Sequence, residues 1–310
     1  MVVNSYTSNS KTMAKRYLLK ALLLVVLLIV SDRGIGYGLR WMYRHQQGGD
    51  YRSATRAIEE QCADVLILGS SRARHHYNPV IIADSLQMEV YNAGRDGCFL
   101  VYQWAQLQLI LDRYTPRIIL LEVTPYDFNL NPSDYDRLAG LLPYQDCPSF
   151  KEVIRKKSPW EQWKCMSSIY PYNGQILSMV TSMDANETDW IDGFDPLQGS
   201  IVHPMETGNG GAIDQLDEEK VKLMYEIIDL CEEKGIELFM ITSPYYIHFT
   251  HSETLSRIQA ICVERHIPYI SYLNNLDYAD GKLYQTADHL NAEGANKFST
   301  MVAEWVKSQE

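Results

Sequence analysis

The sequence lacks the short patterns by which several common protein classes are identified. Its six cysteines are scattered, and none stands in a Cys-x-x-Cys pair, so a structural zinc site is not indicated. There is no Gly-x-Ser-x-Gly elbow, no His-Glu-x-x-His motif and no Walker-type phosphate loop. The formal net charge is −11, with no basic stripe among aromatic residues. We therefore expect no metal, no cofactor and no nucleic-acid partner.

Long apolar runs are limited to one, near the N-terminus. Lys15 and Arg16 precede residues 17–30, an apolar stretch interrupted only by Lys20. The run is short for a spanning helix, which needs roughly 20 residues. However, Lys20 can extend to the interface and residues 34–42 add apolar surface. No small-x-small cleavage pattern follows the run, so we expect an uncleaved anchor with its N-terminus in the cytoplasm.

The expected anchor divides the chain into four parts. They are a cytoplasmic tail (1–16), a transmembrane anchor (17–42), a polar juxtamembrane linker (43–60) and a folded domain (61–310). Trp41 and Tyr43 would lie at the membrane surface as interfacial aromatic residues. Outside the cytoplasm the cysteines can form disulfides, with Cys147 and Cys165 as the first pair to test, or remain buried thiols.

After the linker, short apolar runs alternate with helix-forming segments. The runs with the composition of buried strands are residues 64–68, 88–91, 117–123, 237–242 and 267–270. Strands that alternate with helices predict a parallel sheet with helices on both faces. We therefore predict an α/β fold of three layers, α/β/α, with a parallel five-stranded sheet of flavodoxin-like type. Residues 126 to about 215 break the rhythm and are expected to form an insertion at the carboxyl edge of the sheet.

Three polar segments stand near the expected carboxyl ends of strands, where active sites of such sheets lie. Residues 69–72 (Gly-Ser-Ser-Arg) follow the first strand, 91–94 (Tyr-Asn-Ala-Gly) follow the second, and 287–291 (Ala-Asp-His-Leu-Asn) precede the last helix. A serine in such a place can act as a nucleophile when an imidazole takes its proton. Each segment alone is equally typical of a turn or a helix cap. Their order along the chain is what indicates a site.

This order resembles the SGNH, or GDSL-like, hydrolase family over residues 64–298. The motifs that carry the resemblance are Gly-Ser-Ser-Arg-Ala, Tyr-Asn-Ala-Gly and His-Leu-Asn-x-x-Gly-Ala. The resemblance implies that Ser71 is the nucleophile, that the amides of Ser71 and Gly94 form an oxyanion hole, and that His289 is the general base. The sequence looks most similar to the membrane-anchored branch that includes the D-alanyl-lipoteichoic-acid transfer proteins.

The chain departs from the family pattern at two places. The acid expected three residues before the histidine is replaced by Thr286, and the nearest carboxylate is the adjacent Asp288, the candidate third catalytic residue. His289 could instead be oriented by a backbone carbonyl or by an acid from elsewhere, such as Asp280. The Gly-x-Asn-Asp block is also missing after the third strand, so no third oxyanion donor is nominated.

Two further residues are weaker candidates for substrate contact. Arg72 follows the nucleophile and could bind an anionic group of the substrate, or it could form a salt bridge on its helix. Asn92 precedes Gly94 and could contact the substrate or orient the second turn.

The resemblance implies ester chemistry at a bacterial cell envelope. Water or a sugar hydroxyl would resolve the acyl-enzyme, giving a serine esterase or an O-acyltransferase that acts on acetyl-like esters of envelope glycans. The implied partners are the membrane, an envelope glycan or acylated small substrate, and a membrane-bound O-acyltransferase. The implied location is the inner (cytoplasmic) membrane, with a single pass and a periplasmic C-terminal domain. The alternative is a catalytically inactive envelope protein that binds glycans or acts as a scaffold.

Overall fold

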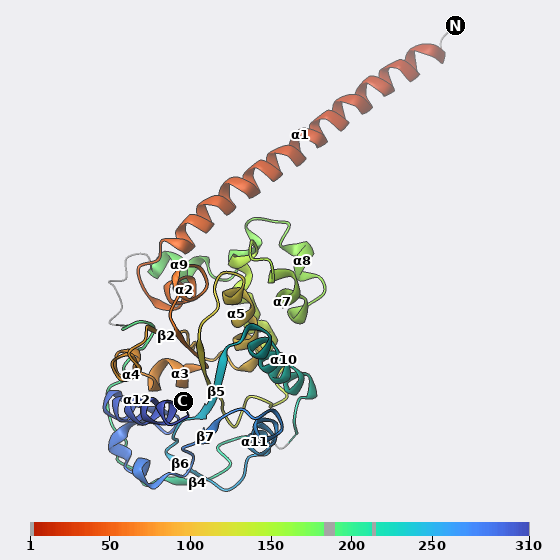
Figure 1. Cartoon of the computed structure of the whole chain (residues 1–310). Helices are drawn as coiled ribbons and strands as arrows, with labels where there is room; N and C mark the ends of the chain where they lie inside the picture. Colours follow the sequence, from red (N-terminus) through yellow and green to blue (C-terminus); the bar gives the residue numbers. More distant parts are fainter. Residues whose placement is uncertain (1–2, 183–189, 213–214, 310) are drawn as a thin grey trace.

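The computed structural model describes residues 3–182, 190–212 and 215–309 and shows an α/β architecture (Figure 1). Its main sheet contains five parallel strands in the order β2-β1-β3-β5-β7. These strands are β1 (Val65–Leu68), β2 (Val90–Asn92), β3 (Ile118–Glu122), β5 (Glu237–Thr242) and β7 (Tyr269–Ser271). The predicted parallel five-stranded sheet is therefore confirmed, and every strand begins and ends within two residues of its expected bounds.

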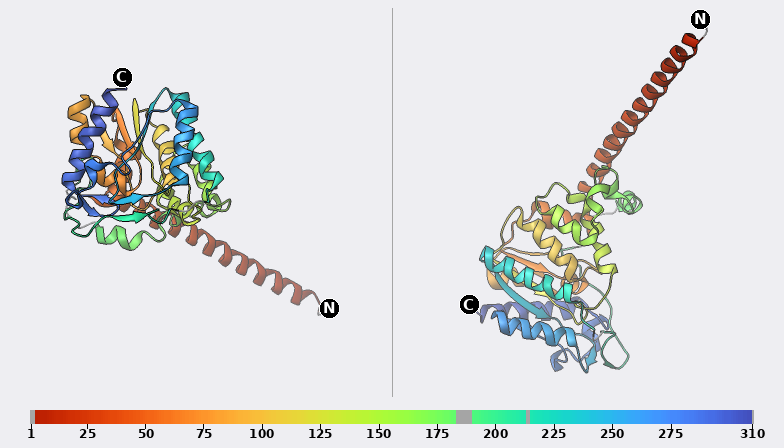
Figure 2. Two further views of the ribbon diagram at one scale, coloured as in Figure 1. Left: turned by 90° about the horizontal axis from the view of Figure 1, so that it is seen from below. Right: turned by 90° about the vertical axis from the view of Figure 1, so that its right-hand side faces the viewer.

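Two layers of helices cover the sheet (Figures 1 and 2). Helices α3, α4 and α12 pack on one face, while α5, α10 and α11 pack on the other. Their bounds are α3 (Ser71–His76), α4 (Pro79–Leu86), α5 (Leu100–Leu111), α10 (Glu218–Lys234), α11 (Glu253–Arg265) and α12 (Ala292–Lys307). The three-layer arrangement follows from strands that are apolar on both sides, because each face of the sheet must then be covered.

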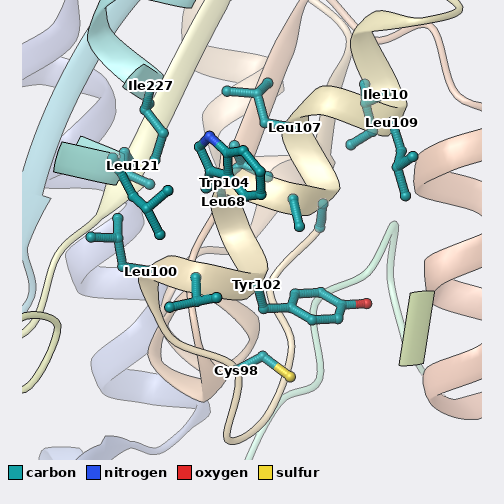
Figure 3. Packing of buried hydrophobic residues seen from close by; sticks show 14 of the residues in the cluster. Leu68, Cys98, Leu100, Tyr102, Trp104, Leu107, Leu109, Ile110, Leu121 and Ile227 are labelled. Carbon is teal, nitrogen blue, oxygen red and sulfur yellow. The ribbon is translucent and has the colours of Figure 1, made fainter. Parts of the chain in front are cut away.

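Alternate residues of β1 enter two separate hydrophobic cores. Leu68 joins the core that contains Trp104 of α5, whereas Ile67 joins the core that contains Phe298 of α12. Figure 3 shows Leu68, Trp104, Leu121 and other apolar side chains gathered in the first of these cores. Because every residue of β1 and β3 is buried, these central strands hold the sheet's carboxyl edge in a fixed place.

The segment from 126 to 215 lies between β3 and α10 and, in its described parts, contributes no strand to the main sheet. Its elements are α6 (Ser133–Asp136), η2 (Arg137–Tyr144), α7 (Phe150–Lys157), α8 (Glu161–Lys164), η3 (Tyr170–Tyr172), α9 (Ile176–Ser182) and β4 (Glu206–Gly208). β4 pairs in parallel with β6 (Ile247–Phe249). Leu141, Phe150 and Ile154 are buried in the core around α5, so much of this segment is integral to the domain. Cys147 and Cys165, like the other four cysteines, are free thiols.

Helix α1 (Val3–Arg44) is continuous and projects from the domain as a rod (Figure 1). Its nine apolar residues 22–30 are exposed, with relative accessibilities between 49% and 62%. The last turns contact the domain instead, because Tyr43 is only 1% exposed and its hydroxyl lies 3.1 Å from that of Tyr144. Among the helices that the structure describes, none combines the length and the apolar composition that a membrane crossing requires.

The prediction that residues 43–60 form a juxtamembrane linker is wrong. Most of it forms α2 (Gly49–Thr55) and the π-helical turn η1 (Arg56–Glu60). Ala54, Ala57 and Ile58, spaced three and four residues apart, supply one buried face that packs into the core around α5. Tyr43, expected at a membrane surface, belongs to the same core. The polar composition of the segment conceals this short apolar face, which is why the sequence alone indicates a linker.

Candidate active site

Ser71 stands where the central strand β1 passes into α3. Gly69 permits the tight turn, since a Cβ there would lie 2.6 Å from the Cβ of Ala73 and 2.8 Å from the Cβ of Glu122. The side chain of Ser70 accepts a hydrogen bond from the N–H of Arg72 and so caps the helix. Ser71 is then the first residue of α3, with a partly exposed side chain at the carboxyl edge of the sheet.

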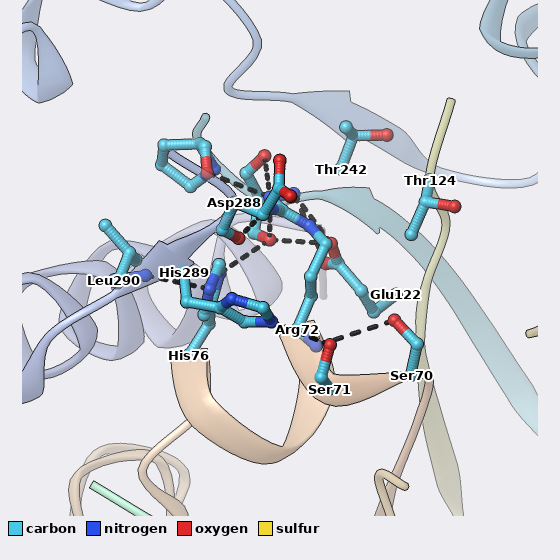
Figure 4. Close-up of polar contacts among 12 residues, drawn as sticks. Ser70, Ser71, Arg72, His76, Glu122, Thr124, Thr242, Asp288, His289 and Leu290 are labelled. Atoms are coloured by element: carbon cyan, nitrogen blue, oxygen red, sulfur yellow. Dashed lines mark hydrogen bonds and ion pairs between the residues drawn. The ribbon is translucent and has the colours of Figure 1, made fainter. Parts of the chain in front are cut away.

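His289 reaches the same edge from the C-terminal part of the chain. It lies in a small antiparallel pair formed by β8 (Tyr284–Thr286) and β9 (His289–Leu290). Its Nε2 lies 2.8 Å from Ser71 Oγ, within hydrogen-bonding distance across 218 residues of sequence (Figure 4). The structure therefore brings together the two residues that the sequence singled out as nucleophile and base.

The second ring nitrogen of His289 contacts Thr286 rather than a carboxylate. Nδ1 lies 2.9 Å from Thr286 Oγ1, in the register of the β8–β9 pair. Asp288, predicted as the candidate acid, is exposed, and its side chain has no hydrogen bond to the imidazole in the described residues. Asp280 is not the orienting acid either, because Thr286 occupies Nδ1 and the described contacts of the Asp280 carboxylate are with the N–H of Lys282. The site is therefore a serine–histidine pair oriented by a threonine hydroxyl.

Burial sets the protonation state of His289. Its pKa is lowered to about 4, first because burial disfavours the charged imidazolium and then because Arg72 and His75 lie nearby. Asp96 opposes this shift weakly. At neutral pH the ring is uncharged, so Nε2 can accept the Ser71 proton while Nδ1–H donates to the Thr286 hydroxyl.

His76 holds the strand that carries His289. The backbone N–H of Leu290 donates to His76 Nε2 at 3.0 Å. His76 Nδ1 then donates to Ser243 Oγ at 2.9 Å, and this hydroxyl donates to Glu122 Oε1 at 2.6 Å. Because Nε2 accepts, His76 must be neutral, and burial lowers its pKa well below the usual value. The chain of hydrogen bonds fixes the backbone directly beside the candidate base.

Arg72, expected as a weak substrate ligand, instead links three strand ends. Its side chain is buried, and Nε forms an ion pair with Glu122 at 3.1 Å. The terminal nitrogens donate to the backbone oxygens of Ser243, Pro244 and Asp288. The ring centroid of Tyr245 lies 3.4 Å from the guanidinium carbon. Arg72 therefore forms a salt bridge, but with Glu122 of β3 rather than on its own helix, and the protein's own groups surround the guanidinium in place of a substrate anion.

Asn92 and Gly94 also have structural rather than substrate-facing positions. Asn92 is fully buried, and its Nδ2 donates to the carbonyl oxygens of Ala73 at 2.7 Å and Tyr77 at 2.9 Å. Its Oδ1 accepts the N–H of Gly94 at 2.9 Å, so this amide is already engaged. A Cβ on Gly94 would lie 2.4 Å from the backbone nitrogen of Arg74. Glycine is therefore required here because the backbone passes close to α3.

Because the Gly94 amide is engaged, the Ser71 amide is the one expected oxyanion donor that remains. The backbone N–H of Ser71 has no acceptor among the described residues, since Ser70 caps the next amide instead. This N–H belongs to the same residue as the Oγ that would attack. It can therefore stabilise an oxyanion that forms at the nucleophile itself.

Several residues of this site were not assigned a role from the sequence. They are Thr286, His76, Ser243 and Glu122. One signal was available: Glu122 ends the otherwise apolar strand Ile-Ile-Leu-Leu-Glu, and a carboxylate buried at a strand end needs a charged or hydrogen-bonding partner. Thr286 also had a signal, because it stands three residues before the histidine, where the family pattern has the acid, but its contact with His289 depends on the register of β8 and β9.

A cleft adjoins the site on the side of His75. The His75 ring lies edge-on to that of His289, with centroids 5.5 Å apart, and its Nε2 lies 3.3 Å from Asp96 Oδ1. Asp96 also lines a cleft of about 320 Å³ together with Asp50, Arg95, Arg137 and Asn173. In the described part of the chain, no three His, Cys, Asp or Glu side chains are grouped so as to hold a metal ion.

Comparison with known proteins adds only remote neighbours. No protein-family model and no curated protein matches the sequence. Among solved structures, the chain is similar to a candidate lipolytic protein of the G-D-S-L family from Desulfitobacterium hafniense DCB-2, at 10% identity and a TM-score of 0.40, over 78% of this chain and 98% of that one. It is also similar to a candidate acylhydrolase from Bacteroides fragilis NCTC 9343, at 10% identity and a TM-score of 0.41, over 83% and 95% of the two chains. At these values the functional argument rests on the residues of the site itself.

Proposed function

We propose that the protein is a serine esterase or O-acyltransferase of SGNH type, with Ser71 as nucleophile and His289 as general base. The observation that carries this proposal is the 2.8 Å contact between Ser71 Oγ and His289 Nε2. A nucleophile and a base within hydrogen-bonding distance, with the base oriented by a third group, form the arrangement that acyl transfer needs. Here the third group is the Thr286 hydroxyl.

The reaction would proceed in two balanced steps. Ser71 Oγ attacks the ester carbonyl while its proton moves to His289 Nε2, and the N–H of Ser71 binds the oxyanion. Collapse of this intermediate returns the proton to the leaving alcohol and leaves an acyl-serine. Water or a sugar hydroxyl then gives its proton to Nε2 and attacks the acyl group, and Ser71 Oγ leaves and takes this proton back from Nε2. The nature of this second acceptor decides between an esterase and an O-acyltransferase.

The absence of an acid partner shapes the expected activity. Thr286 can orient the neutral ring, but it cannot offset the positive charge that develops on His289 during proton transfer. The low pKa of His289 likewise disfavours the imidazolium. Modest turnover is the natural consequence, and it suits a substrate held in place by other contacts better than one met by free diffusion.

We further propose that the substrate is an acetyl-like ester of an envelope glycan and that α1 attaches the domain to a bacterial inner membrane. The exposed apolar residues 22–30 support the attachment. The cleft beside Asp96, lined by residues of both charges, supports a polar acceptor such as a sugar. A membrane-bound O-acyltransferase that supplies acyl groups and a periplasmic location extend this proposal. So does membership of the branch that includes the D-alanyl-lipoteichoic-acid transfer proteins.

A second candidate is a catalytically inactive envelope protein that binds glycans. Two observations favour it: a threonine takes the place of the acid, and the Gly94 amide is engaged by Asn92. A protein that kept the fold but no longer catalysed acyl transfer would tolerate both of these features.

A fluorophosphonate probe separates the two candidates. The active protein should label on Ser71, and Ser71→Ala should abolish both labelling and hydrolysis of a small acetyl ester. Ser70→Ala is the matched control, because its side chain caps α3 and does not contact His289. Labelling that survives Ser71→Ala would refute this nucleophile, and a well-folded protein that is never labelled would favour the binding protein.

A further inference from the structure

The turn that follows α8 is fastened to α1 just beyond its exposed apolar run. Asp32 accepts hydrogen bonds from Ser167 Oγ at 2.5 Å and from the N–H of Ser168 at 2.8 Å. Arg33 donates to the backbone oxygen of Met166 at 3.0 Å. Residues 32 and 33 follow the end of the run at Val30 by two and three positions, which is about 3–5 Å along a helix. This turn therefore lies at the level where the apolar part of α1 ends.

Three large apolar side chains are exposed on and beside this turn. Trp160, Trp163 and Met166 have relative accessibilities of 68%, 61% and 64%. We call these three residues the apolar rim. A compact group of exposed tryptophan and methionine side chains is unusual on a protein surface that faces only water. The hydrogen bond from Arg33 to the backbone oxygen of Met166 places one end of the rim beside α1, just beyond the exposed apolar run.

The exposure of the rim is built into a fixed local structure. Glu161, between the tryptophans, is 1% exposed and accepts from Lys164 Nζ at 2.8 Å and from the Tyr170 hydroxyl at 2.7 Å. These hydrogen bonds fix α8 to the domain through the side chain of Glu161, so that the two tryptophan side chains point into solvent. The hydrogen bonds to Asp32 hold the next turn in the same way.

The segment that carries the rim is basic in sequence, and Lys151 and Arg155 remain outside the ion pairs that Lys156, Lys157 and Lys164 form with Glu226, Asp136 and Glu161. Residues 151–164 carry five basic and two acidic side chains, in a protein whose formal net charge is −11. The basic residues are Lys151, Arg155, Lys156, Lys157 and Lys164. Such a local excess of positive charge is complementary to anionic lipid headgroups.

We propose that the apolar rim inserts into the interface of an anionic lipid bilayer, beside α1, and sets the orientation of the domain relative to the membrane. Tryptophan favours this interface because its ring is apolar and its N–H remains hydrated. The proposal deepens the membrane attachment described above and rests on it, but it does not depend on the ester chemistry. It also replaces Trp41 and Tyr43 as the interfacial residues, since Tyr43 is buried and Trp41 lies eleven residues beyond Val30.

The test uses the full chain in vesicles that contain phosphatidylcholine, with or without phosphatidylglycerol, and in matching vesicles with brominated acyl chains. Flotation reports attachment, and quenching of tryptophan fluorescence by bromine reports the depth of the rings. We expect quenching that increases with phosphatidylglycerol and decreases with salt. Trp160→Ser/Trp163→Ser should remove most of this quenching, whereas Trp41→Phe should leave it in place.

A second pair of variants keeps both tryptophans as reporters. Met166→Lys should reduce the quenching, whereas Leu276→Lys, at an exposed apolar residue outside the rim, should not. Quenching that disappears in Trp41→Phe but not in the double variant would overturn the proposal. So would a protein that floats with vesicles without any quenching, or a fluorescence shift that follows protein concentration rather than lipid. A chain that does not float would reject the membrane attachment itself, while leaving the Ser71 labelling test untouched.

Discussion

The hydroxyl of Thr286 lies 2.9 Å from Nδ1 of His289, in the position where a carboxylate would complete a catalytic triad. This contact orients the imidazole toward Ser71 without adding negative charge. It makes the threonine the natural point at which to alter the strength of the base.

Thr286→Asp should strengthen the base. A carboxylate at this distance raises the pKa of an imidazole by about 1–3 units, because it stabilises the charged form. We expect kcat/KM for a small acetyl ester to rise by about tenfold or more. Thr286→Val is the matched control, since it keeps the shape but removes the hydroxyl, and it should lower kcat. Equal activity in all three proteins would show that Thr286 does not act through His289.

The pH dependence of the wild-type protein should reflect the low pKa of His289. The base must be neutral to accept the Ser71 proton, and its pKa of about 4 keeps it neutral through most of the acidic range. We therefore expect kcat/KM to stay level from pH 8 down to about pH 5 and to fall by half near pH 4. In Thr286→Asp this midpoint should move upward. A wild-type midpoint near 6.5 would mean that His289 is not buried as described.

His76 should act as a positioning residue. His76→Ala removes the acceptor for the N–H of Leu290, so kcat should fall by about tenfold or more while KM changes little. His76→Gln can accept and donate a hydrogen bond and should restore part of kcat. Loss of substrate binding with unchanged kcat would contradict the positioning role.

The same residue predicts a dependence of stability on pH. The folded-state pKa of His76 lies well below the unfolded value of 6.5, so the unfolded chain binds a proton that the folded chain does not. This contribution is fully present above pH 6.5 and is lost as the pH falls toward the folded-state pKa, by up to about 1.4 kcal/mol per pH unit. His289 contributes with the same sign. Urea unfolding at pH 7 and pH 5 should therefore show a smaller pH effect in His76→Gln than in the wild type.

The pair of Arg72 and Glu122 should be important for stability. Both side chains are buried, so Arg72→Met leaves the Glu122 carboxylate without its counter-charge and should destabilise the fold by about 3–5 kcal/mol. The exposed pair of Lys222 and Glu219 is the control, and Lys222→Ala should change stability by no more than about 0.5 kcal/mol. Denaturant unfolding measures both, and similar values for the two variants would argue against the structural role of Arg72.

The fold was predictable because its strands are buried on both faces. A run such as Val-Leu-Ile-Leu has few alternatives once helices flank it, and parallel strands bring their carboxyl ends to one edge. The meeting of Ser71 and His289 followed from this topology and the family resemblance. Thr286 was marked only by its place three residues before the histidine, and His76 by no pattern, because their hydrogen bonds depend on the register of a short β-pair and on which face of α3 turns inward. Residues 43–60 were misassigned because a few buried apolar side chains outweigh their polar composition.

The continuous helix α1 would set the height of the candidate site above the membrane in the proposed attachment. From Val30 to Arg44 the helix rises by about 21 Å, and six residues later Asp50 forms an ion pair with Arg74, one turn beyond Ser71. Only residues 45–48 separate α1 from α2, and Gln46 among them is buried and donates to the backbone oxygens of Met42 and Met179. Under the proposed attachment, a bilayer that holds α1 would therefore also determine how far an ester must protrude to reach Ser71. Seven residues added after Val30 would lift the site by about two helical turns while nearly keeping its orientation. With the proposed activity, esters on short carriers would then be out of reach of Ser71, whereas the hydrolysis of dissolved esters would not change.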